Sequence, residues 1–489
     1  MRVTSSRFAR LLLTAGLVAL ALPAVPAQAA IPLPSQDPFY TYTGATPLAQ
    51  VKPGTVLKTR SVTLGADVNP TPLPATQLLY RTQDELGRPT ATVTTVITPP
   101  GSTVAPKIIA YLSFYDSLAD KCDPSYTLQG GDPGAANTQL TDAEQAFVEA
   151  YVATGNVVTV PDFEGPGLHW TAGHEAGRSA LDAVRATESF LKAPATTMVG
   201  LTGYSGGSIA AEWAAELAPV YAPEVNLVGV AAGGVPVHFA HNLTYINGSP
   251  VWSGIIPAVF HALAQGYDLN LEAYLSPYGK SLVDKDKHGC IGDFSGTHPG
   301  LRVEQLLKPE YRDILHVKAF ADIVNNLIMG TAPGAPKVPM LLAVGNNGSS
   351  IGDDVMITGD VEALAHEYCG QNVPILFETY PQSAHTQAGG IFEPNAVSFL
   401  VARFAGVPMV DNCATVGEGN SLAPLTPTAA TPPKSGGTQK PHTTASAGQA
   451  SGSSLPATGP TALVGLAALA LLTFAGTVTV VARRTARRP

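Results

Sequence analysis

The segment Gly203-Tyr204-Ser205-Gly206-Gly207 matches the pattern G-x-S-x-G. On a sharp turn between a strand and a helix, such a serine can expose its hydroxyl as a nucleophile, and the glycines keep side chains out of the turn. An apolar run at 198–202 precedes the motif and a helical pattern follows it. The N-terminus of that helix would lie beneath the negative charge of a reacting carbonyl. We therefore predict that Ser205 is a nucleophile.

A serine hydroxyl needs a base, and on a turn of this kind the partners follow in the chain order Ser, Asp or Glu, then His. Among the 11 histidines, His385 follows the strand predicted at 374–379. This position is the carboxyl end of a strand, where ligands bind in open α/β sheets. The other histidines precede the acid, lie in helical patterns or follow no strand. We predict His385 as the base, on a loop before a helix over 394–404.

Two adjacent carboxylates are candidates for the acid. The strand predicted at 339–344 leads through a Gly/Asn/Ser loop to Asp353 and Asp354. Adjacent side chains point in different directions, so only one can orient the imidazole, which leaves the other to cap the following helix. The residue types alone leave both assignments open.

Short β-branched runs alternate with helical patterns between residues 31 and about 415. Near-continuous apolar strands separated by helices predict a mostly parallel sheet covered on both faces, which is the α/β-hydrolase class of fold when combined with the serine turn. The region from about 234 to 331 breaks the alternation, and we expect a mainly helical cap inserted there. The expected strands cover 107–113, 156–160, 198–202, 226–231, 339–344 and 374–379, and the expected helices cover 141–153, 175–191, 208–217, 359–368 and 394–404.

The two ends of the chain have the composition of sorting segments. Residues 1–29 combine a basic start, an apolar stretch and Ala27-Gln28-Ala29, which predicts a signal peptide. Residues 416–454 are rich in Thr, Pro, Ser and Gly and predict a flexible stalk. The uncharged run 461–482 is long enough to span a bilayer, and an Arg-rich tail follows it.

Charge and cysteine content exclude several classes of function. Without the seven arginines of the signal peptide and tail, 21 basic residues face 37 acidic ones, a net charge of about −16 that disfavours nucleic acid as a partner. An even count of cysteines in an exported chain suggests two disulfides, with three possible pairings. No CxxC or HExxH pattern occurs, so we expect no metal and no cofactor. The four cysteines are Cys122, Cys290, Cys369 and Cys413.

Several segments, in this order, resemble the secretory lipase family of α/β-hydrolases over roughly residues 40 to 413. They are Phe114-Tyr115-Asp116-Ser117, Cys122-Asp123-Pro124-Ser125-Tyr126, Val160-Pro161-Asp162-Phe163-Glu164-Gly165-Pro166, Leu181-Asp182-Ala183-Val184-Arg185-Ala186, Gly203 to Gly207, Gly352-Asp353-Asp354-Val355-Met356, Tyr368-Cys369 and His385. Near the C-terminus, Leu455-Pro456-Ala457-Thr458-Gly459 resembles the LPxTG motif that sortases of Gram-positive bacteria read.

The family resemblance implies roles for residues of this chain. It implies Asp353 rather than Asp354 as the acid beside Ser205 and His385. It implies an oxyanion hole formed by Asp116 and the backbone N–H of Gly206, where a donor is typically worth about 3 kcal/mol. The resemblance also implies the disulfides Cys122–Cys290 and Cys369–Cys413.

The cap is expected to contribute an acyl-chain pocket, or else simply the core of a helical subdomain. The candidate pocket residues are Tyr204, Phe239, Trp252 and Phe260.

Together these patterns predict a secreted serine ester hydrolase of lipase or esterase type, with acyl esters as substrates. Sortase would join Leu455–Gly459 to peptidoglycan and anchor the protein to the cell wall of a Gram-positive bacterium. A peptidase or acyltransferase could use the same three residues, and a surface binding protein could keep the fold without turnover.

Overall fold

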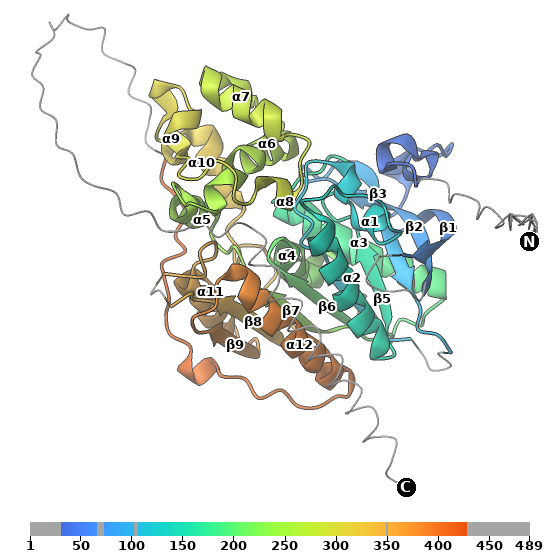
Figure 1. Ribbon diagram of the computed structural model, residues 1–489. Helices are drawn as coiled ribbons and strands as arrows, with labels where there is room; N and C mark the ends of the chain where they lie inside the picture. The colour runs from blue at the N-terminus through green and yellow to red at the C-terminus, as the bar shows by residue number, and fades with distance from the viewer. Residues whose placement is uncertain (1–30, 66–72, 102–105, 349–350, 428–489) are drawn as a thin grey trace, which may run out of the picture.

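The computed structural model describes residues 31–65, 73–101, 106–348 and 351–427. Within them, one nine-stranded sheet has the strand order β1-β2-β3-β5-β4-β6-β7-β8-β9 (Figure 1). The strands β1, β2, β3 and β5 pair antiparallel, and every later pair is parallel. The strands are β1 Val56–Leu64, β2 Leu73–Gln83, β3 Pro89–Ile97, β4 Ile108–Leu112, β5 Val157–Pro161, β6 Val199–Tyr204, β7 Leu227–Gly233, β8 Met340–Gly345 and β9 Ile375–Tyr380.

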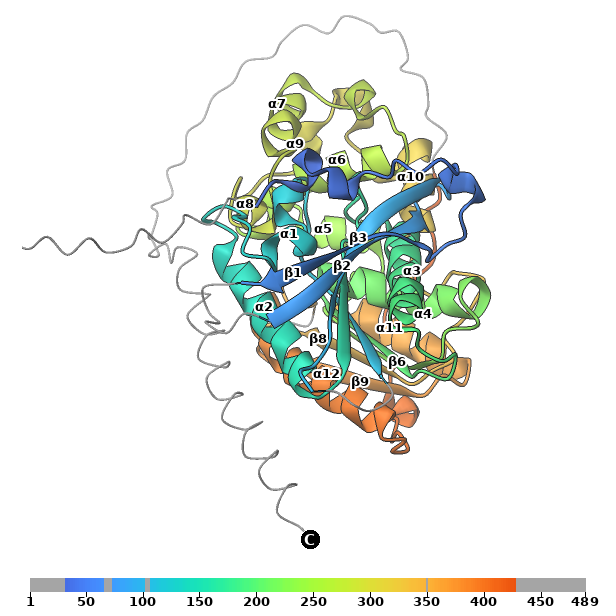
Figure 2. The same cartoon turned by 90° about the vertical axis from the view of Figure 1, so that its right-hand side faces the viewer.

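Helices cover both faces of the sheet. The helices α3, α4 and α11 pack on one face, and α2 and α12 pack on the other, where they run side by side (Figures 1 and 2). The predicted α/β-hydrolase architecture is therefore confirmed. The helices outside the cap are α1 Pro124–Thr127, α2 Thr138–Ala153, α3 Gly173–Leu191, α4 Gly206–Tyr221, α11 Thr358–Gly370 and α12 His385–Phe404.

The central strands are apolar on both sides because both sides are covered. All five residues of β4 are buried. Ile108 and Leu112 join the core beneath α3 and α4, whereas Ile109 and Tyr111 join the core beneath α2 and α12. Successive side chains of a strand point to opposite faces, so a two-sided core needs an unbroken apolar run. Such runs made the central parallel strands predictable, whereas the edge strand β9 is mostly only partly buried.

A mainly helical cap lies between β7 and β8, as predicted from the region 234–331 (Figure 1). Its helix α6 is almost wholly buried, and Phe260 packs on Phe320 of α10 with ring centroids 5.2 Å apart. The α-helices of the cap are α5 Phe239–Ile246, α6 Ile256–Gly266, α7 Pro277–Asp286, α8 Ile291–Phe294, α9 Val303–Leu306 and α10 Lys318–Asn326.

The residues just after 415 pack on the enzyme, although composition predicted a stalk from 416. Asn420 N donates to Gly359 O at 2.8 Å, and its side chain donates to Asp360 Oδ1 at 2.7 Å. Farther along, Leu425 N donates to Asn325 Oδ1 at 2.7 Å. The boundary at 415 was therefore placed too early, and the segment 416–427 joins α11 to cap helix α10.

The predicted signal peptide, the LPATG motif and the apolar run 461–482 lie outside the described residues. Across the ranges that the structure does describe, no helix has the length and apolar character needed to cross a membrane.

Candidate active site

Ser205 lies on the turn between β6 and α4, as the motif predicted. Its backbone has φ 54° and ψ −122°, a strained conformation for a residue with a side chain. Its N–H donates to Gly233 O at 2.8 Å, which fixes the turn against β7. A β-carbon at Gly203 would collide with the Gly207 carbonyl, and one at Gly207 would collide with Leu112 O. The glycines of the motif therefore allow the close backbone contacts that expose Ser205.

Three of the predicted residues form one continuous hydrogen-bonded chain. His385 Nε2 lies 2.7 Å from Ser205 Oγ, and His385 Nδ1 lies 2.8 Å from Asp353 Oδ2. The second carboxylate oxygen, Asp353 Oδ1, accepts from the backbone N–H groups of Val355 at 3.1 Å and Met356 at 2.7 Å. Asp353 is fully buried and His385 is 4% exposed. The carboxylate is thus held in one orientation against the imidazole.

His385 is the first residue of α12 rather than part of a longer loop. The prediction that the helix starts at Pro394 was wrong, because α12 continues through that proline from His385. The backbone N–H of His385 donates to Asp353 O at 2.8 Å, and Tyr204 OH donates to His385 O at 2.5 Å. The helix terminus, the acid loop and the serine strand therefore all fix the position of the imidazole.

Asp354 points away from the histidine. Its backbone has φ 86°, and both of its carboxylate oxygens accept from Asn347 Nδ2 at 2.7 Å. The N-cap position of α11 is Ile357, so Asp354 does not cap that helix as expected. Its role is to hold the loop that carries Asp353.

Asp116 lies directly beside Gly206. A β-carbon at position 206 would collide with Asp116 Oδ1, and the Asp116 backbone has φ 37°. Burial and the nearby Glu144 carboxyl raise the pKa of Asp116 well above its ordinary value and outweigh a hydrogen bond from the Trp170 side chain. Oδ1 has no hydrogen-bond partner among the described residues. With a proton on Oδ1, this carboxyl can offer an O–H donor beside the Gly206 N–H.

An apolar cavity of about 440 Å³ opens at Ser205. Tyr204, Phe239 and Trp252 line it, as predicted, and the Trp252 ring meets the His385 ring edge-on at 5.5 Å. Phe260 does not line the cavity, because its ring is buried against Phe320 in the cap core. The cap therefore provides both a cavity wall and a core of its own.

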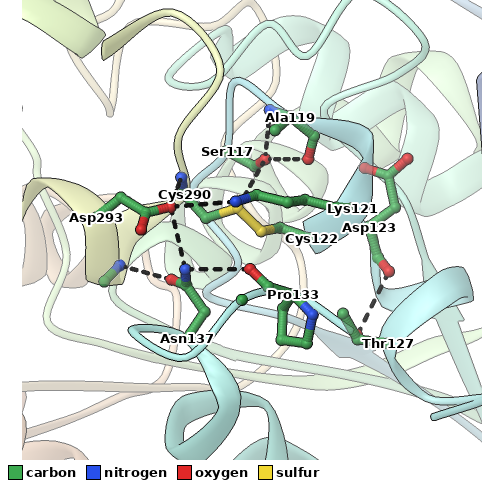
Figure 3. The surroundings of a disulfide bond; sticks show 12 residues. Ser117, Ala119, Lys121, Cys122, Asp123, Thr127, Pro133, Asn137, Cys290 and Asp293 are labelled. Carbon is green, nitrogen blue, oxygen red and sulfur yellow. Dashed lines mark hydrogen bonds and ion pairs between the residues drawn. A yellow bond between two sulfur atoms is a disulfide. The ribbon is translucent and has the colours of Figure 1, made fainter. Parts of the chain in front are cut away.

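Both disulfides join the expected cysteines. Cys122–Cys290 connects the loop after Asp116 to the cap, and Asp293 beside it accepts from Asn137 Nδ2 at 3.2 Å and pairs with Lys121 at 3.5 Å (Figure 3). Cys369–Cys413 connects the end of α11 to the segment after α12. Each bond therefore braces an element that carries or supports a site residue.

Sequence reasoning missed one wall of the cavity. The cavity is also lined by Tyr151 and Phe147 of α2 and by Gly390 and Glu393 of α12. In the sequence Phe147 and Tyr151 read as ordinary helix positions, whereas Gly390 and Glu393 fall in the loop expected after His385, and no motif marks any of them. Among the residues placed by the structure, no group of three or more His, Cys, Asp or Glu side chains is arranged to hold a metal ion.

Comparison with known proteins identifies the family. Residues 132–412 match the secretory lipase family. A probable inactive lipase of Mycobacterium tuberculosis is 32% identical over 78% of this chain and 84% of its own length. A secreted triacylglycerol lipase of Malassezia globosa is 33% identical over 72% and 77%. The crystal structure of Candida antarctica lipase A in its closed state is 28% identical, with a TM-score of 0.72 over 79% of this chain and 90% of that one. The chain belongs to the secretory lipase family and is a carboxylic ester hydrolase of the α/β-hydrolase fold.

Proposed function

We propose that this chain is a secreted lipase or esterase that hydrolyses acyl esters, including acylglycerols, through an acyl-enzyme on Ser205. The observation that carries the proposal is the hydrogen-bonded chain Ser205–His385–Asp353 at the mouth of an apolar cavity. The Malassezia relative, named a secreted triacylglycerol lipase, supports acylglycerols as the substrate class.

The reaction starts with a proton transfer. His385 Nε2 takes the proton of Ser205 Oγ as this oxygen forms a bond to the ester carbonyl carbon. The imidazolium that forms keeps its Nδ1–H on Asp353, whose negative charge stabilises it. Because Asp353 Oδ1 is already held by two backbone N–H groups, little reorganisation is needed at this moment.

The carbonyl oxygen becomes negative when the bond to Ser205 forms. The N–H of Gly206, at the start of α4, donates to it, and the neutral carboxyl of Asp116 provides a second donor from the opposite loop. A donor aimed at this oxygen typically lowers the barrier by about 3 kcal/mol.

The intermediate then breaks down. The bond to the alcohol oxygen breaks, and this oxygen takes the proton from His385 Nε2 as the alcohol leaves. The acyl group stays on Ser205 until a water molecule, deprotonated by the same nitrogen, attacks it. The carboxylic acid leaves, and Ser205 regains its proton.

The cap side of the cavity suits an acyl chain. Its walls there include Phe239, Leu243, Ile246, Ile256 and Val259, all without polar atoms in their side chains. An extended hydrocarbon chain buried against them is favoured by about 0.8 kcal/mol per CH₂ group.

A fluorophosphonate reagent tests the nucleophile, because it labels only an activated serine. We expect the purified chain to be labelled and the Ser205→Ala variant to remain unlabelled. Hydrolysis of p-nitrophenyl esters of increasing acyl length, beside peptide substrates, then defines the reaction class. Preferential hydrolysis of peptides would contradict the proposal.

A surface binding protein is the second candidate, since one relative is a probable inactive lipase. Failure of the chain to react with fluorophosphonate or any ester would favour that candidate.

We also propose that the enzyme is exported and then anchored to a Gram-positive cell wall. The LPATG motif at 455–459, the apolar run 461–482 and the Arg-rich tail support this. The test is to replace Thr458 by Ala and fractionate the cells. We expect the parent chain in the wall fraction and the variant in the membrane or medium.

A further inference from the structure

The cavity at Ser205 has a second side, away from the cap. There it is lined by one stripe of α2, including Leu140, Ala143 and Phe147, and by a facing stripe of α12. The two helices lie side by side on the same face of the sheet, with α2 in teal and α12 in orange (Figures 1 and 2). We name this part of the cavity the α2–α12 groove.

Small residues keep the α2–α12 groove open. The cavity lining includes Ala143 and Ala150 of α2 and Gly389 and Gly390 of α12. A β-carbon added at Gly390 would have no heavy atom within 4 Å, whereas one at Gly389 would press on the Tyr204 ring at 2.9 Å. There is thus unfilled space beside Gly390, about one and a half helical turns along α12 from His385.

One polar group in the groove wall is unpaired. Glu393 is 3% exposed, and its Oε2 accepts from Tyr151 OH at 3.1 Å. Tyr151 OH also lies 3.1 Å from Thr202 Oγ1, so the phenol hydroxyl has hydrogen-bond partners on two sides within the protein. Glu393 Oε1 has no hydrogen-bond partner among the residues that the structure places. A buried oxygen without a partner is costly unless a ligand completes it.

The protonation state of Glu393 defines which partner it needs. Burial raises the pKa of the Glu393 carboxyl to about 8, and the Glu144 carboxyl adds to the effect. At neutral pH the group is therefore a carboxylic acid. With Oε2 accepting from Tyr151, Oε1 carries the hydroxyl and offers an O–H donor. Its natural partner is an acceptor oxygen.

We propose that the α2–α12 groove binds the alcohol part of the ester, and that Glu393 selects alcohols bearing a further oxygen atom, as glycerol esters do. The inference rests on the proposed function, since it assigns the two sides of the cavity to the two halves of one substrate. An acyl chain fits the apolar cap side and would leave Glu393 unpaired. A hydroxyl or ester oxygen on the alcohol part satisfies it.

The first test compares two substrates with the same acyl chain, monooctanoylglycerol and propyl octanoate. We expect the ratio of kcat/KM for the glycerol ester to kcat/KM for the propyl ester to fall about tenfold in Glu393→Leu, as for the loss of one hydrogen bond. Glu393→Gln keeps an N–H donor and should retain most of the ratio. Equal ratios in all three proteins would overturn the inference.

The ratio should also depend on pH. As pH rises through about 8, the parent enzyme loses the Glu393 proton and its preference for the glycerol ester should fall, whereas Glu393→Gln should show no such decline. Any effect of pH on the chemical steps common to both esters cancels in the ratio. Other titratable groups face Glu393, and burial raises the pKa of each of them. They are Tyr151 and Glu144 on α2, Tyr111 on β4, Tyr204 on β6 and Tyr380 on β9.

Glu144 is the one of these groups that titrates near neutrality, since burial raises its pKa to about 7. The pH series is therefore repeated in Glu144→Gln. A decline that persists in this variant belongs to Glu393, and one that disappears would contradict the inference.

A second variant tests the groove without touching Glu393. Gly390→Leu places a side chain into the open space and should lower kcat/KM for glycerol and other bulky alcohol esters at least tenfold more than for methyl octanoate. Gly370→Leu is the matched control, because a β-carbon there also meets nothing within 4 Å and the residue does not line the cavity. A change in acyl-length preference instead would overturn the assignment of the groove to the alcohol.

These outcomes separate the two proposals. Suppose the parent chain reacts with fluorophosphonate and cleaves p-nitrophenyl butanoate, and the substitutions at Glu393 and Gly390 leave the ratios of kcat/KM unchanged. Only the groove assignment then fails. If the parent chain shows neither reaction, the proposed function fails with it.

Discussion

The carboxyl group of Asp116 occupies the space that a β-carbon at position 206 would need. These residues come from the loop after β4 and from the start of α4, which are distant in the sequence. Their contact brings the two proposed oxyanion donors together, and it explains why position 206 must be glycine in this enzyme.

Gly206→Ala should therefore displace Asp116 and damage the oxyanion hole. We expect a loss of about 10²–10³ in kcat for p-nitrophenyl esters, the effect of removing one oxyanion donor. The melting temperature and the kcat are measured together, with Gly370→Ala as a control in open space. Full activity in Gly206→Ala would show that the contact has no catalytic role.

Asp116 should act as a neutral donor rather than as a carboxylate. Burial raises the pKa of Asp116 well above its ordinary value, so the carboxyl keeps its proton to a higher pH and loses this donor as the solution becomes alkaline. We expect Asp116→Asn to retain far more kcat than Asp116→Ala and to lack the alkaline decline of the parent. If the pH profiles of the parent and of Asp116→Asn coincide at high pH, the side chain is not the donor.

The two adjacent aspartates should differ sharply in their effects. Asp353→Asn replaces the acceptor of the His385 N–H, and we expect kcat to fall by about 10⁴. Asp354→Asn changes only a contact with Asn347, and we expect kcat within about threefold of the parent. The measurement is the steady-state kcat of the two purified variants. A similar loss of kcat in both would refute the assignment of Asp353 as the acid.

Glu144 should make the fold less stable as pH rises. Burial raises its pKa from 4.5 to about 7, although Ser113 and Phe114 N donate to it. The folded state keeps a proton that the unfolded chain releases, so stability falls between these two values, by up to about 3 kcal/mol. Urea titrations at pH 5 and pH 8 should show a smaller loss for Glu144→Gln than for the parent. An equal loss in both would assign the decline to other groups.

The central parallel strands β4 to β8 were predictable because they are largely buried and covered on both faces. The antiparallel strands β1 to β3 were missed, and β1 shows why. Its residues alternate between partly buried and exposed positions, and several are Thr, Lys or Arg. Such a strand has no continuous apolar run, and only its pairing with β2 identifies it.

The site residues that belong to a sequence motif were predictable. Those whose position depends on tertiary packing were not. The start of α12 was missed because Gly389 and Gly390 are poor helix formers, at a cost of about 1 kcal/mol each. Packing of α12 on β7 and β8 overrides that preference. The segment 416–427 was assigned by composition to the stalk, yet side-chain hydrogen bonds at Asn325 and Asn420 hold it. Glu393 falls in the loop that was expected between His385 and Pro394, and only the structure shows that it is buried on α12.

The bond between Cys122 and Cys290 also limits which parts of the active-site mouth can move apart. It joins the rim of the active-site mouth that begins at Cys290 to the loop that bears Asp116. This rim and the proposed oxyanion donors therefore move together. The turn that carries Trp252 belongs to the same rim, because Gly296 N donates to Val251 O at 2.8 Å and Ser253 Oγ donates to His298 O at 2.8 Å. The disulfide and these hydrogen bonds together therefore hold the Trp252 wall of the cavity at a fixed distance from the loop that bears Asp116.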